Sequence, residues 1–178
     1  MRLLNLGEYA AIGARAVGIE QSSPYSFIFS FEKMALRDAL KSPSGARAFA
    51  IGLYDFLHGA APLQRRFEDW VEVVAALPRR QTRVLTWPVV TVFGFLAQPA
   101  THFFMKPKVT RAAALAYSHP LRYQSRPSWE IYAGLLGLAR HQAGPARPRT
   151  ARHDRYSVVS VGARLGRIQR LANCGRDH

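Results

Sequence analysis

Hydrophobic positions recur at helical spacing along most of the first 139 residues. The clearest stripe follows Pro62, where apolar side chains fall three and four positions apart: Phe67, Trp70, Val71 and Val74. Apolar residues at this spacing lie on one face of an α-helix. Proline and glycine punctuation separates several such stretches. The pattern predicts helices over 7–17, 25–40, 46–58, 62–77, 88–97, 109–117 and 127–139.

The helix predicted over 88–97 is central to the chain. Thr86 or Trp87 supplies an N-cap, and Pro88 suits the first helical turn, where its missing N–H is no loss. One face carries an apolar residue at each helical repeat: Val89, Val92, Phe93 and Leu96. Val90 and Phe95 lie off that face and are also apolar. A helix that is apolar all round is a buried one, so we expect this helix inside the core.

Three of the other helices have predicted inward faces. These faces are Phe27, Phe31 and Met34 in 25–40; Phe49, Leu53 and Phe56 in 46–58; and Ile131, Leu135 and Leu138 in 127–139. On the outer side of 62–77, Arg65 and Asp69 stand four positions apart and should form an ion pair.

Two short apolar runs break the helical pattern. Residues 102–105 are short enough for a buried strand, and residues 121–123 are a candidate partner strand. The predicted fold class is therefore mainly α, that is, α+β with only a minor short two-stranded element. We expect residues 1–139 to form a single compact helical domain.

A membrane span is the alternative for the central stretch. Twenty-two residues between Arg83 and Lys106 contain no Asp, Glu, Lys or Arg, and about 20 apolar residues cross a bilayer. Pro88, Pro99 and several polar residues interrupt this stretch, and its unbroken apolar part is about half the needed length. The pattern favours a buried core helix, so we expect no membrane span.

Length and cysteine content narrow the class of protein. A chain of 178 residues fits one domain and can bury a sizeable core. Cys174 is the only cysteine, which excludes a disulfide within the chain and a cysteine-based zinc site. Glu8 interrupts the N-terminal apolar run too early for a signal peptide. We expect a cytoplasmic location.

The formal charge of +14 is unevenly distributed. Residues 140–178 hold nine Arg and two Asp, a net of +7, and residues 1–139 hold sixteen Lys and Arg against nine Asp and Glu, also +7. Beyond Arg140 the sequence loses its apolar period and becomes rich in Arg, Ala, Gly and Pro. Such a composition cannot bury enough apolar area to offset chain entropy. We therefore expect 140–178 to be a basic, poorly packed tail that is disordered or non-native.

Three stretches carry a resemblance to a known family. They are L-P-R-R-Q-T-R-V-L-T-W-P-V-V-T-V-F-G-F-L-A-Q-P, H-F-F-M-K-P-K-V-T-R-A-A-A and Y-Q-S-R-P-S-W-E-I-Y, all within residues 77–132. Residues 1–139 resemble an uncharacterised bacterial protein family with no established activity, so the resemblance implies no function.

The tail departs from that family. Its members end in a string such as D-M-I-D-I-Q-S-F-x-W-V-Q-G, which this chain lacks. Codons allowed for residues 155–163, read one base later, spell D-I-Q-S-F-L-W-V. We interpret the C-terminus as frameshifted. An in-frame tail would carry apolar residues, so its loss should leave an apolar groove uncovered.

Candidate catalytic and metal-ligating residues are few. Asp55 and His58, with Glu68 and Glu72, form only a fragment of a helical metal set, and we interpret them as solvated charges. His102 and His119 have no nucleophile or carboxylate nearby in sequence, so core or surface histidines are expected. The phosphate-loop, dinucleotide and hydrolase motifs are all missing. We expect no catalytic residue, no metal and no cofactor.

One set of residues remains as a candidate binding site. It comprises the cations on both sides of the central helix: Arg79, Arg80, Arg83, Lys106, Lys108, Arg111, Arg122 and Arg126. Trp87, Tyr123 and Trp129 are candidate stacking faces beside them. The set predicts a non-catalytic binding protein whose partner is nucleic acid or another anionic surface, such as an acidic protein. A solvated rim, a protein–protein accessory module without nucleic-acid affinity and an enzyme of unrecognised type are the alternatives. The oligomeric state is left open.

Overall fold

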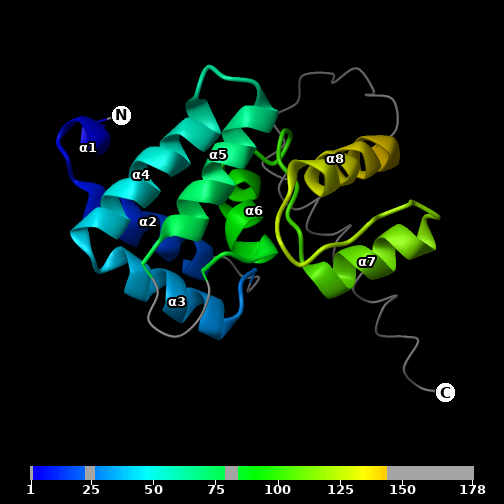
Figure 1. Cartoon of the computed structure of the whole chain (residues 1–178), viewed down its shortest axis with the longest axis horizontal. Helices are drawn as coiled ribbons and strands as arrows, with labels where there is room; N and C mark the ends of the chain where they lie inside the picture. Colours follow the sequence, from blue (N-terminus) through cyan, green and yellow to red (C-terminus); the bar gives the residue numbers. More distant parts are fainter. Residues whose placement is uncertain (1, 23–26, 79–83, 144–178) are drawn as a thin grey trace, which may run out of the picture.

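The computed structural model describes residues 2–22, 27–78 and 84–143, and these residues are mainly helical, as predicted (Figure 1). The helices, in chain order, are α1 (Arg2–Asn5), α2 (Tyr9–Ser22), α3 (Ser30–Leu40), α4 (Pro43–His58), α5 (Leu63–Ala76), α6 (Trp87–Ala97), α7 (Pro107–Ala116) and α8 (Trp129–Ala143). Helices α2 to α6 form one group, and α7 and α8 lie together on one side of it.

The core lies where α4, α5 and α6 meet, and aromatic rings fill it. The Phe56 ring stacks on Trp70 at 5.8 Å between centroids, and the Phe49 ring meets Phe93 edge to face at 5.4 Å. The indole N–H of Trp70 donates to the carbonyl of Val90 at 2.9 Å. A buried indole needs such a partner, so this bond fixes α5 against α6.

Helix α6 begins as the sequence predicts, whereas α4 begins at Pro43, three residues before the predicted start, because Ser42 caps it. Ser42 precedes Pro43 and accepts the N–H of Gly45 at 3.0 Å, which caps α4. Thr86 accepts the N–H of Val89 at 3.4 Å and caps α6, with proline again in the first turn. These side chains satisfy N–H groups that have no partner inside the helix.

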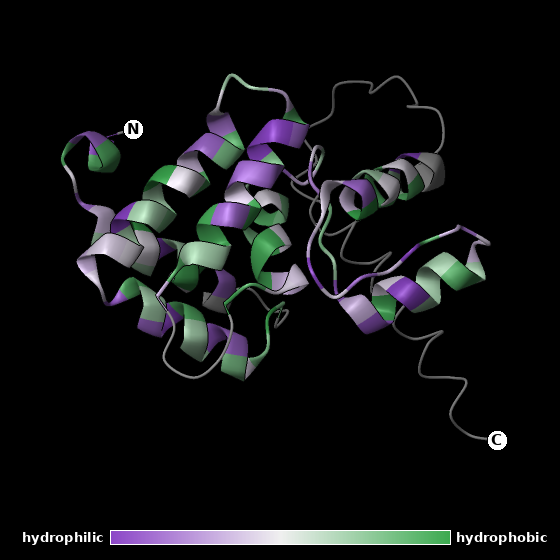
Figure 2. Cartoon of the chain, in the orientation of Figure 1, coloured by the Kyte–Doolittle hydropathy of each residue, from purple (hydrophilic) through white to green (hydrophobic). Residues whose placement is uncertain are grey.

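The predicted face of α5 is confirmed. Its four apolar residues are all buried, while Arg65 and Asp69 form an exposed ion pair at 3.1 Å on the outer side. Figure 2 shows the two sides of this helix in contrasting colours.

Helix α6 is the buried centre of the molecule. Every residue from Trp87 to Phe95 is buried, and Leu96 is half-buried. The prediction of a core helix that is apolar all round is therefore confirmed. Across the described parts of the chain, no helix combines the length and apolarity that a bilayer crossing requires.

The predicted two-stranded element is absent, because residues 2–22, 27–78 and 84–143 contain no strand. Residues 102–105 are nevertheless close to the core, and side chains take the place of a partner strand. The N–H of Met105 donates to the hydroxyl of Thr91 at 3.0 Å, and the N–H of Phe103 donates to the hydroxyl of Tyr132 at 3.2 Å. Buried backbone donors need partners; here α6 and α8 supply them.

The predicted inward face of α3 is wrong. The helix begins at Ser30, and it buries Glu32, Leu36 and Ala39. Phe31 and Met34, which we expected inside, are 54% and 63% exposed. The Glu32 carboxylate accepts the N–H of Phe29 at 2.8 Å in the first turn. This hydrogen bond sets the first turn of α3 at Ser30. The face that carries Leu36 and Ala39 then lies toward the core. Residues 25 and 26 of the predicted helix lie outside the described residues.

Helix α8 buries its predicted face of Ile131, Leu135 and Leu138. It runs to Ala143, four residues into the segment 140–178 that we expected to be a tail. The rest of that segment lies outside the described residues, so the frameshift and the uncovered groove remain predictions.

Candidate nucleic-acid interface

The predicted basic set falls partly outside the described residues, since Arg79, Arg80 and Arg83 belong to the undescribed connection between α5 and α6. The other five lie at α7 and on the segment that leads from it to α8: Lys106, Lys108, Arg111, Arg122 and Arg126. We call this region, residues 106–126, the basic arm. The sequence contains no Asp or Glu between Glu72 and Glu130, so the arm has no carboxylate of its own to neutralise it.

Helix α7 presents most of its surface to solvent. It buries only Thr110 and Ala114. Lys108, Arg111 and Leu115 lie at i, i+3 and i+7 on its exposed side. Lys106 is the N-cap residue and makes no side-chain cap. The first N–H groups of α7 therefore add partial positive charge to a region that already carries cations.

Arg111 is fixed by an aromatic ring. Its guanidinium lies 5.2 Å from the ring centroid of Tyr123, which belongs to the segment after α7. A cation over a ring face is attracted by the ring quadrupole. The contact joins the two halves of the basic arm and brings Arg111 and Arg122 into one region.

Lys106 is fixed in the same way by a residue far away in the sequence. Its ammonium lies 5.1 Å from the ring centroid of Phe29, just before α3. The Phe29 ring is also stacked on Phe31, with centroids 5.6 Å apart and planes 5° from parallel. We call Phe29, Phe31 and Met34, which are all exposed, the aromatic patch. Lys106 thus joins the patch to the basic arm.

Arg126 is the one described member of the set with a carboxylate partner. It donates to Glu72 at 3.3 Å, with both side chains about 70% exposed. Exposed ion pairs contribute little to stability, so Glu72 holds Arg126 only weakly.

Most of the predicted stacking residues are unsuitable for stacking on nucleic-acid bases. Trp87 is buried, and its indole N–H donates to the carbonyl of Gln124 at 2.8 Å. Trp129 packs against both rings of the stacked pair Phe67 and Tyr132. Tyr123 is partly exposed and carries Arg111. The exposed ring pair Phe29 and Phe31 was missed.

His102 is a core histidine, as predicted. Its Nδ1 lies 3.1 Å from the hydroxyl of Tyr132, and its ring meets Phe56 at 4.6 Å. Burial, aided by the nearby Arg66 charge, lowers the pKa of His102 to about 4. Burial also raises the pKa of Tyr132 to about 12, against the opposing effect of the Phe103 N–H. Both groups are therefore neutral near pH 7, and they orient residues 102–105.

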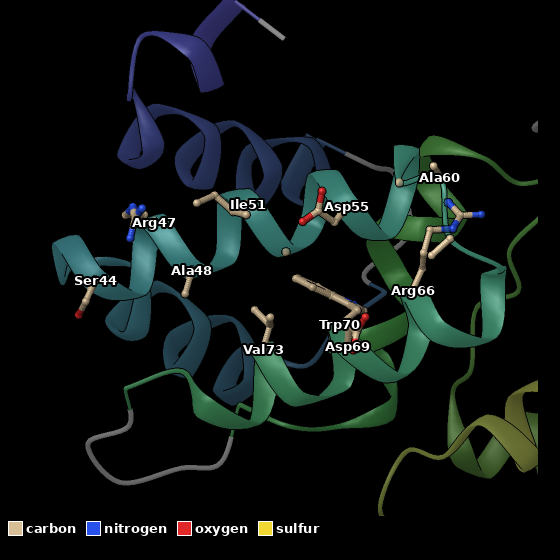
Figure 3. A pocket seen from close by; sticks show the side chains of 13 residues that line it. Ser44, Arg47, Ala48, Ile51, Asp55, Ala60, Arg66, Asp69, Trp70 and Val73 are labelled. Carbon is tan, nitrogen blue, oxygen red and sulfur yellow. The ribbon is translucent and has the colours of Figure 1, made fainter.

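A pocket of about 550 Å³ lies between α4 and α5 (Figure 3). Val73 and Trp70 line it from α5, with Asp55 and Ser44 on α4. Asp55 and Ser44 are eleven residues apart on one helix, about 16 Å along its axis, so they cannot act as a nucleophile and its base. No histidine lines the pocket.

The pocket also offers no metal site. Within the described residues, no three His, Cys, Asp or Glu side chains gather closely enough to hold an ion. Asp55, His58 and Glu72 are exposed and Glu68 is half-buried. Glu68 accepts a hydrogen bond from Gln64 at 3.1 Å, and Glu72 pairs with Arg126.

Comparisons with known proteins give no relative: no family model, no curated protein and no solved structure matches the chain.

Proposed function

We propose that this chain is a non-catalytic binding protein that takes nucleic acid on the basic arm. One observation carries the proposal: five cations stand on a region whose sequence holds no carboxylate, and two of them are held on aromatic rings. Cations held in place lose less side-chain entropy when they bind. Neutralising phosphates and releasing their counterions drives sequence-independent binding.

The test compares two triple variants of equal charge change. Lys108→Ala/Arg111→Ala/Arg122→Ala removes three exposed cations of the arm, and Arg15→Ala/Arg37→Ala/Arg47→Ala removes three exposed cations from α2, α3 and α4. Binding to a DNA oligonucleotide is followed by fluorescence anisotropy over a salt series. We expect the arm variant to reduce the slope of log K against log salt by about 0.7–0.9 for each lost contact. The other variant should keep most of that slope.

Equal losses in the two variants would show that net charge alone matters and would overturn the site. Binding that survives the arm variant undiminished would also overturn it.

A second candidate function is a protein–protein accessory module. It is favoured by Leu115, which is 81% exposed at the end of α7. Isolated exposed apolar residues are common, but this one lies on a helix with little other packing. If the protein binds no oligonucleotide even at low salt, nucleic-acid binding is overturned and the accessory module is the remaining candidate.

A further inference from the structure

We propose that Phe29 and Phe31 form a base-stacking platform, and that the preferred ligand is single-stranded nucleic acid. This inference rests on the proposed function of the basic arm and deepens it by naming the form of the ligand. It concerns a surface on the side of the α2–α6 group, outside the arm itself.

The geometry of the ring pair carries the first step. Two phenylalanine rings lie in nearly parallel planes and are 46% and 54% exposed. Rings that served the core would be buried, because removing a large apolar side chain from water stabilises a fold. The chain instead leaves adjacent flat rings exposed. Aromatic faces at which successive bases stack are the common device of proteins that bind single strands.

The platform is held in place from beneath. The Glu32 carboxylate accepts the N–H of Phe29 at 2.8 Å, and the buried Glu20 accepts the N–H of the neighbouring Ile28 at 3.2 Å. The second Glu20 oxygen pairs with Lys33 at 3.0 Å. These two carboxylates are buried, so they fix the backbone without exposing negative charge beside the rings.

Charge complementarity identifies the occupant. Lys106 lies over the Phe29 ring, and the exposed Lys108 follows two positions later at the start of α7. Phe31 stacks on Phe29 and Lys106 lies over the Phe29 ring, so a base stacks on the exposed Phe31 ring, and Lys106 and Lys108 meet its phosphate. Unpaired nucleotides offer a flat base and a phosphate together. Duplex DNA keeps its base faces covered by stacking. The carboxylates of an acidic protein surface have no flat ring to stack on phenylalanine.

The experiment separates rings from charges in the full chain. The double variant Phe29→Leu/Phe31→Leu keeps apolar side chains but removes the flat faces, and Phe29→Tyr/Phe31→Tyr keeps the faces. Met34→Leu, elsewhere in the patch, is the matched control. Each is titrated with a fluorescent oligo(dT) and with a duplex of equal length at one moderate salt concentration. Circular dichroism confirms that the variants retain their helices.

We expect the leucine variant to bind oligo(dT) about 5- to 150-fold more weakly for each stacked base that it loses. Its duplex affinity and its salt slope should match the wild type, since no cation has changed. The tyrosine and Met34→Leu variants should bind oligo(dT) within about twofold of the wild type, because they keep the ring faces.

Three results would overturn the platform. Equal wild-type affinity for oligo(dT) and duplex, unchanged in the leucine variant, leaves the proposed function standing and removes the platform alone. Self-association of the chain that blocks oligo(dT) and persists in the leucine variant, which keeps the patch apolar, would identify the patch as a protein interface. No binding of either oligonucleotide by the wild type would remove the proposed function and the platform together.

Discussion

The α4–α5–α6 core and the basic arm are held in different ways. In the core, rings such as Phe56 and Trp70 stack face to face with no access to solvent. In the arm, α7 buries two small side chains, and ring contacts hold Lys106 at its N-terminal end and Arg111 near its middle. The core excludes water from its contacts, whereas the two cation–ring contacts of the arm are partly exposed to water.

The two kinds of contact differ in what they contribute, stability in the core and side-chain positioning in the arm. Buried apolar contacts stabilise the fold in proportion to the area removed from water. Exposed cation–ring contacts are worth about 0.5–1 kcal/mol each, so they position side chains without adding much stability. Regions with few buried contacts open more readily, and binding surfaces are drawn from such regions.

Residues 102–105 connect the two regions. Thr91 of the core holds the N–H of Met105, and the Thr91 hydroxyl itself donates to the carbonyl of Trp87 at 2.7 Å. Met105 is fully buried, and the next residue is Lys106, where the arm begins. The arm is therefore anchored to the core by a hydrogen-bonded segment on its N-terminal side.

The largest expected effect comes from the core. Phe93→Ala should lower the free energy of unfolding by about 3–5 kcal/mol, through lost burial and the cavity left behind. Phe93 is buried and meets the Phe49 ring at 5.4 Å. Urea unfolding measures this cost. A loss under about 1 kcal/mol would contradict the placement of Phe93 in a well-packed core.

A pair of glycine variants sharpens the comparison. At Gly94 an added Cβ would lie 2.9 Å from His102 and from Phe56, whereas at Gly137 of α8 it would meet no atom within 4 Å. Gly94→Ala should therefore cost about 1–3 kcal/mol through overpacking. Gly137→Ala should stabilise the protein by up to about 1 kcal/mol, because alanine is the better helix former.

Thermal and urea unfolding of both glycine variants provide the measurement. A neutral Gly94→Ala variant would mean that α6 and residues 102–105 separate easily. The core and its anchor would then not be one tightly packed unit.

Local patterns in the sequence predicted much of the core. The stripe of α5 and the cap and proline at the start of α6 depend on residues within a few positions of each other, so spacing alone revealed them. The strand at 102–105 was a wrong prediction because the partners of its N–H groups, Thr91 and Tyr132, are distant in sequence. No local pattern reports such side-chain bonds.

The charged residues of the candidate site were predicted from the sequence, but its exposed aromatic residues were not. The positions of Lys106 and Arg111 are plain in the sequence, but the ring under Lys106 belongs to Phe29. We interpreted Phe31 as an inward residue of a helix over 25–40. Phe27, Phe29 and Phe31 alternate with other residues, and this two-residue period was the available signal that the helix begins later.

The pH dependence of stability tests the junction between the core and residues 102–105. In the folded protein the pKa of His102 is about 4, below its ordinary value of 6.5. The unfolded chain therefore takes up a proton first as the pH falls. The contribution of neutral His102 to the free energy of unfolding is therefore fully present above about pH 6.5. It is lost progressively toward pH 4.

Urea unfolding between pH 7 and pH 4.5 measures this loss, with His102→Asn as the reference. The variant should be less stable at pH 7 but should show a shallower decline on acidification. Parallel declines in the two proteins would mean that His102 is solvated and that the junction is open.

The smallest expected effect comes from the arm. Lys106→Met keeps the length and apolar stem of the side chain but removes the ammonium over the Phe29 ring, a contact 5.1 Å long. Global stability should fall by no more than about 1 kcal/mol. Hydrogen exchange of the α7 amides should nevertheless quicken more than that of α6, because α7 has few other contacts to hold it. Lys108→Met, an exposed residue of the same helix, is the matched control and should change neither quantity. A global loss in Lys106→Met as large as that of Phe93→Ala would show that the arm folds as part of the core, and the two regions would then differ in exposure but not in stability.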